Sequence, residues 1–87
     1  MYNYEAEKHK IFTERGSEEF TRVRDQALKL LDEAGAFKML SATKGITGSS
    51  WTMMAYVDRL VETGEIREIT GDNVAGQDRV FVSAKIR

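Results

Sequence analysis

The stretch from Phe37 to Ala84 constrains the fold most, because it sets two helix-like segments around a turn and follows them with two strand-like runs. The turn is Lys44-Gly45-Ile46-Thr47-Gly48, and its glycines interrupt any helix that enters it. Gly64 predicts the end of the second helix. The buried face of that helix is expected at Met53, Val57, Leu60 and Val61. The runs at 66–70 and 80–84 are separated by turn-forming residues, so they predict a β-hairpin.

Before this stretch, the sequence predicts a longer helix over Ser17–Ala34. Ser17 is the expected N-cap and Gly35 the expected stop. Apolar residues recur at three- and four-residue steps along one stripe: Phe20, Val23, Ala27, Leu30, Leu31 and Ala34. Residues 1–16, which end at Gly16, are expected to form an N-terminal arm that is either flexible or a short extra helix, and residues 17–87 the domain itself. The set Phe37, Met39, Leu40 and Ala42 fits a short helix, or a strand turn leading into one.

This order of elements resembles the winged helix-turn-helix domain. The resemblance rests on Gly64-Glu65-Ile66-Arg67-Glu68-Ile69 and Gly76-Gln77-Asp78-Arg79-Val80-Phe81-Val82, which look like the end of a recognition helix and the two strands of a wing. It implies an α+β fold with three helices followed by a two-stranded β-hairpin wing. It also implies a small, non-enzymatic protein that binds double-stranded DNA, as a transcriptional regulator or a recombination accessory factor. The small size suggests a phage or mobile-element origin.

In this fold the second helix of the pair enters the major groove, and residues near its start reach the bases. The resemblance therefore implies contacts from the start of that helix, from the turn before it and from the hairpin. Arg79 is similar to the wing arginine of the multiple-antibiotic-resistance regulator family, in which an Asp-x-Arg pattern recurs. Here Asp78 and Arg79 are adjacent, so Arg79 is alternatively expected to pair with an acidic neighbour. The full set of implied DNA-binding residues is Lys44, Ser49, Ser50, Trp51, Thr52, Tyr56, Arg59, Asn73, Gln77 and Arg79.

Trp51 has two interpretations that depend on where the helix begins. If Ser49 is the N-cap, Trp51 falls off the buried face and is exposed, which for so large an aromatic residue indicates a binding surface. If Thr47 is the N-cap, Trp51 joins Met54 and Leu60 in the core. Capping alone also explains the hydroxyl residues at the helix start.

Charge argues in two directions about the partner. The net charge is −1 and the isoelectric point is about 5.8, whereas proteins that neutralise several phosphates are usually basic. This balance favours an alternative function, a winged-helix module that binds protein and not DNA. Residues 37–57, however, hold Lys38 and Lys44 and no Asp or Glu. A phosphate backbone is tolerated best at such an acid-free stretch.

Composition excludes several other classes. With 87 residues, the chain can bury one small core. It has no cysteine and a single histidine, His9, and no Asp, Glu or His residues at metal-ligand spacing, so no catalytic site, metal or cofactor is expected. No apolar run is long enough for a membrane span and no secretory signal is apparent, so a cytoplasmic protein is expected. No small-molecule ligand is predicted. Homodimerisation is expected from the few contacts one such domain makes, through the 17–34 helix, the arm or the Phe81 face.

Overall fold

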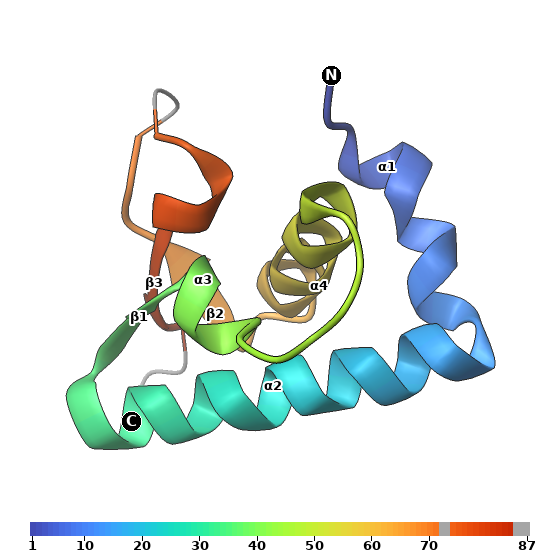
Figure 1. The fold of residues 1–87 in the computed structure, drawn as a ribbon. Coiled ribbons are helices and arrows are strands. Elements are labelled where there is room, and N and C mark those ends of the chain that lie inside the picture. The colour runs from blue at the N-terminus through green and yellow to red at the C-terminus, as the bar shows by residue number, and fades with distance from the viewer. Residues whose placement is uncertain (72–73, 85–87) are drawn as a thin grey trace.

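The longest helix, α2 (Glu14–Ala34), runs along one side of the molecule, and several of the other elements pack against it (Figure 1). The computed structural model describes residues 1–71 and 74–84. Along the chain the elements are α1 (Tyr4–Glu7), the 3-10 helix η1 (Lys8–Phe12), α2, β1 (Ala36–Lys38), α3 (Met39–Ala42), α4 (Ser50–Glu62), β2 (Ile66–Glu68), the 3-10 helix η2 (Gly76–Asp78) and β3 (Val80–Ser83). The predicted α+β class is confirmed.

Helix α2 begins three residues before the predicted Ser17. Its N-cap is Thr13, whose side-chain oxygen accepts a hydrogen bond from the Gly16 backbone N–H at 3.0 Å. Gly16 lies within α2 and is buried. A Cβ added at this position would lie 1.8 Å from the carbonyl oxygen of Lys10. The glycine therefore allows η1 to approach α2 closely, and the prediction that it ends the preceding segment was wrong. At the other end, Gly35 stops the helix as predicted, with φ of 79°.

The strands form one antiparallel sheet in the order β1-β3-β2. A third strand therefore joins the predicted two-stranded hairpin, and the alternative of a strand leading into a short helix is correct for residues 36–42. Phe37 of β1 pairs with Phe81 of β3, and their rings stack with centroids 5.4 Å apart. Phe81 is fully buried, so the expectation that its face forms a dimer surface was wrong.

Helix α4 lies between the sheet and the N-terminal segment (Figure 1). Ser49 is its N-cap and accepts a hydrogen bond from the Thr52 N–H at 3.2 Å, which decides between the two predicted starts. Met53, Val57 and Leu60 are buried, as their spacing predicted. Val61 is 38% exposed, so its assignment to that face was wrong. The core that α4 completes contains Val23 and Ala27 of α2, with Leu30 and Leu31 packed at its edge.

The N-terminal segment packs on the rest of the molecule. Ile11 of η1 is 3% exposed and belongs to the core, and α1 lies beside α4 (Figure 1). Asn3 caps α1 by accepting hydrogen bonds from the backbone N–H groups of Glu5 and Ala6. Within the described residues, no helix combines the length and the apolar character needed to cross a membrane.

Candidate functional site

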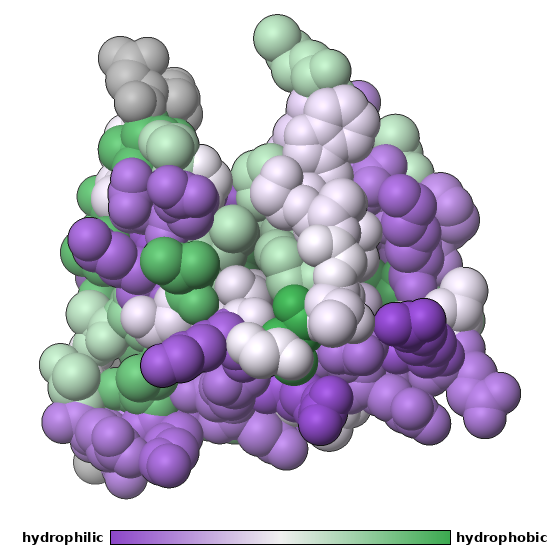
Figure 2. Space-filling model, viewed as in Figure 1, coloured by the Kyte–Doolittle hydropathy of each residue, from purple (hydrophilic) through white to green (hydrophobic). Residues whose placement is uncertain are grey.

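The start of α4 is a solvent-facing surface. Lys44, Ser49 and Ser50 are exposed and Thr52 is half-buried. Trp51 is 43% exposed, which agrees with the interpretation that Ser49 is the N-cap. In Figure 2 the surface over this part of α4 is pale, whereas the strongly hydrophilic colour covers the lower edge of the molecule, over α2. An uncharged surface that includes a large aromatic side chain therefore lies beside the turn that carries Lys44.

Tyr56 does not belong to this surface. Its side chain is 3% exposed, and its ring lies 6.3 Å from the ring of Phe20, centroid to centroid. Burial raises the pKa of its hydroxyl. Tyr56 is three residues after the buried Met53, which places it on the face of α4 that packs against α2. The prediction that Tyr56 contacts DNA is therefore wrong, because its side chain is buried.

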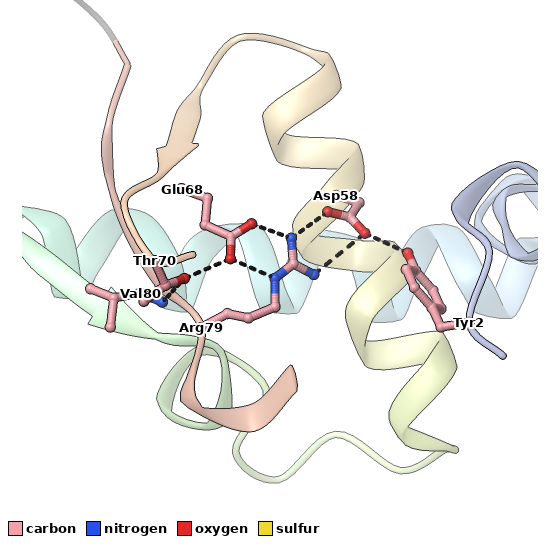
Figure 3. A network of polar contacts seen from close by, with 6 residues as sticks. All are labelled: Tyr2, Asp58, Glu68, Thr70, Arg79 and Val80. Carbon is pink, nitrogen blue, oxygen red and sulfur yellow. Dashed lines mark hydrogen bonds and ion pairs between the residues drawn. The ribbon is translucent and has the colours of Figure 1, made fainter. Parts of the chain in front are cut away.

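Arg79 lies at the centre of an ion-pair network that joins the hairpin to α4 (Figure 3). Its Nη2 lies 2.7 Å from Asp58 Oδ1 on α4 and 2.7 Å from Glu68 Oε1 on β2. Its Nε also donates to Glu68 Oε2 at 3.0 Å, so the contact with Glu68 uses both carboxylate oxygens. Only 15% of the Arg79 side chain is exposed. Arg79 thus pairs with carboxylates, as the alternative expectation held, but its partners are Asp58 and Glu68, which lie 21 and 11 positions earlier in the sequence.

The electrostatics of this network follow from its contacts. Burial opposes the charge on Arg79, but the hydrogen bonds to Glu68 and Asp58 outweigh that effect and raise the pKa of the guanidinium. The hydrogen bonds from Arg79 lower the pKa of Glu68. Thr70 adds a hydroxyl that donates to Glu68 at 2.6 Å. The network therefore favours the charged forms of Arg79 and Glu68.

The N-terminal segment is bound to the same helix through carboxylates of α4. The Tyr2 hydroxyl donates to Asp58 Oδ2 (Figure 3). Glu62 accepts from Tyr4 at 2.9 Å and forms ion pairs with Lys8 at 2.7 Å and Arg59 at 2.6 Å. These donors lower the pKa of Glu62 to about 2, with Lys8 making the largest contribution. Arg59, predicted to contact phosphate, is thus paired with a carboxylate one helical turn away.

Ion pairing leaves an uneven distribution of free charge. Between residues 37 and 71 every carboxylate has a cationic partner: Asp58, Glu62, Glu65 with Arg24 at 3.0 Å, and Glu68. Lys38, Lys44 and Arg67 are exposed in the same range, and none has an acidic partner within 4.0 Å among the described residues. The uncompensated charge over residues 37–71 is therefore positive, although the chain as a whole is slightly acidic.

The hairpin contributes less to this surface than the sequence implied. Gln77 is exposed in η2, and Asn73 lies outside the described residues. An open cleft separates the hairpin from α4 and is lined in part by Tyr2, Met54 and Val74. Gly76 lies close to the Met54 sulfur, 2.8 Å from where a Cβ would be, so η2 packs on α4 at one end of this cleft.

Sequence reasoning missed the residues that assemble this site. Tyr2 and Asp58 are separated by 56 positions along the chain, and no local pattern pairs them. One weak indication was available, because Asp58 is the first carboxylate after Glu33.

Comparison with protein-family models, with curated proteins and with solved structures finds no match to this chain. Among the described residues, no group of three or more His, Asp or Glu side chains is placed to hold a metal ion.

Proposed function

We propose that this chain is a winged helix-turn-helix domain that binds double-stranded DNA, as a transcriptional regulator or a recombination accessory factor. In this proposal α3 and α4 form the helix-turn-helix and the β2–β3 hairpin is the wing. The order α2, β1, α3, α4, β2, β3 supports this assignment, since a turn joins the helix pair and the hairpin follows directly. Because similar folds carry different functions, the argument for DNA depends on the surface.

One observation carries the proposal: the start of α4 is exposed, and no free carboxylate is described on the helix pair. A phosphate backbone approaching α4 meets Lys44 in the turn and the exposed Ser50 and Trp51, while Asp58 and Glu62 are already neutralised by cations. Electrostatic repulsion from this side is therefore small, despite the negative net charge. Lys44 would contact phosphate, and the residues from Ser49 to Thr52 would enter the groove.

Arg59 and Arg79 have a different role in this proposal. Each is held by carboxylates within 2.7 Å, and moving either to DNA would leave those carboxylates facing a polyanion. We assign them to positioning, with Arg79 fixing the hairpin relative to α4. Arg67 on β2 and Gln77 on η2 are both exposed, and we assign them to contact with the phosphate backbone of the DNA.

The proposal predicts weak binding by one copy. Only a few cations are free at the surface, and the logarithm of the affinity should fall by roughly 0.9 for each phosphate contacted per tenfold rise in salt. Useful affinity then requires two copies on adjacent half-sites, which a homodimer would supply.

The test is an NMR titration of the isotope-labelled protein with mixed-sequence duplexes at about 50 mM salt, where electrostatic binding is strong. Amide shifts should cluster between Lys44 and Tyr56, and Lys44→Ala should weaken binding and reduce the salt slope by about one. Lys29→Ala is the matched control, since Lys29 lies on α2 and pairs with Glu33 at 3.9 Å. If no duplex produces shifts, the DNA proposal fails, and the exposed Trp51 then favours a protein partner.

A further inference from the structure

Helix α4 lacks the side chains that usually read guanine and adenine by paired hydrogen bonds. Those readers are Arg or Lys for guanine and Asn or Gln for adenine. Between Ser49 and Glu62 the sequence contains no Lys, Asn or Gln, and a single Arg. That residue, Arg59, donates to Glu62 at 2.6 Å and lies over the ring of Phe12. Direct hydrogen-bond readout by long side chains of α4 is therefore absent.

The short hydroxyl side chains at the helix start are also largely occupied. Ser49 Oγ accepts from the Thr52 N–H, and the hydroxyls of Ser49 and Thr52 lie 3.1 Å apart. Releasing Ser49 to contact a base would leave the first turn of α4 without its cap and destabilise the start of the helix. Ser50 is the remaining hydroxyl near the start of the helix.

Apart from Ser50, the side chains left to face a partner here are apolar. Trp51 is 43% exposed at the first turn of α4. Met54, three residues later, is half-buried and packs against the core and beside Gly76. Residues three apart lie on the same face of a helix, so Trp51 and Met54 form one apolar strip, and Met54 lines the cleft in front of the hairpin.

Only one base offers a complementary apolar group in the major groove, since thymine alone carries a C5-methyl there. We propose that Trp51 is a specificity-determining residue that selects thymine by contact with this methyl group. The inference rests on the DNA-binding function proposed above and deepens it, because it names the chemistry by which α4 chooses its sites. The preferred sites are then rich in A·T pairs at the positions that face Trp51.

The test begins with selection of bound duplexes from a random-sequence pool by the full chain. The enriched duplex is then made in two forms, one with thymine and one with deoxyuridine, which lacks only the methyl group. The thymine form should bind about fourfold more tightly for each methyl contacted, the effect expected for burying one methyl-sized group. Trp51→Ala should bind the two forms equally, which separates direct contact from any change in the duplex itself.

Val61→Ala is the matched control, since Val61 is another exposed apolar residue on α4, 38% exposed and well away from the helix start. This variant should keep the preference for thymine. Circular dichroism of both variants checks that they remain folded.

Equal binding of the two forms by the wild-type chain would overturn the inference and leave DNA binding intact. A preference for thymine that persists in Trp51→Ala would do the same. If no duplex is enriched and none binds in a salt-dependent way, the proposed function fails together with this inference.

Discussion

Replacing Arg79 by Gln tests whether the ion-pair network holds the hairpin against α4. The substitution removes the cation and leaves Asp58 and Glu68 close to each other without neutralisation. Breaking a fully buried pair costs about 3–5 kcal/mol, and an exposed pair is worth about 1 kcal/mol or less. The side chains of Arg79, Asp58 and Glu68 are 15%, 18% and 27% exposed, so they lie nearer the buried case. We expect Arg79→Gln to lower the free energy of unfolding by about 2–4 kcal/mol at pH 7.

The same variant should show a distinctive pH dependence. Arg79 lowers the pKa of Glu68 in the folded chain. A carboxylate with a depressed folded pKa stabilises the fold above its unfolded pKa of about 4.3, and this contribution is lost as the pH falls through the folded value. Arg79→Gln lacks that contribution at every pH. The difference in stability between the two proteins should therefore shrink as the pH falls below about 4.

Urea unfolding followed by circular dichroism measures both effects, provided that the dependence on urea is the same for the two proteins. The matched control is Arg67→Gln, an exposed arginine on the neighbouring strand β2, which should change stability by less than about 0.5 kcal/mol. A loss below about 1 kcal/mol for Arg79→Gln, or a difference that stays constant down to pH 3, would refute this account of the network.

Four further substitutions test the packing and the exposure of Trp51. Leu60→Ala should cost about 2–5 kcal/mol in urea unfolding because Leu60 is 1% exposed, and the half-buried Leu30→Ala should cost less; the reverse order would contradict the assigned burial. Gly16→Ala should destabilise the chain by about 1–3 kcal/mol, because the new Cβ would overlap the Lys10 carbonyl, whereas a gain in thermal stability would show that η1 does not approach α2. Trp51 should emit at long wavelength and be quenched by iodide, and Trp51→Ala should leave the thermal midpoint nearly unchanged; blue emission would mean a buried ring.

Local signals account for most of what the sequence predicted correctly. Cap chemistry, which depends on a few neighbouring residues, identified Gly35 and limited the N-cap of α4 to Thr47 or Ser49, of which the structure has Ser49. The alternation of Val80 to Ser83 likewise reports a half-buried strand. These features hold because the interactions that create them span one turn or one strand.

The features that were missed depend on contacts between distant parts of the chain. β1 has only three residues, too few to show alternation, and is held by β3 more than forty positions later. Gly16 resembled a local break, but its size is required by the approach of Lys10. Arg79 has an acidic residue directly before it, yet it pairs with carboxylates 21 and 11 positions earlier. Spacing along one segment contains no information about such partners.

Asp58 links two parts of the molecule that otherwise lie apart. One of its oxygens receives Arg79 from the hairpin, and the other receives Tyr2 from the N-terminal segment. A partner that moves the hairpin must therefore change the free energy with which the N-terminal segment docks on α4. By reciprocity, detaching that segment must change the affinity for the partner by the same factor. If the hairpin takes part in the proposed DNA binding, the residues before α1 would act on that binding through the carboxylate they share with the hairpin.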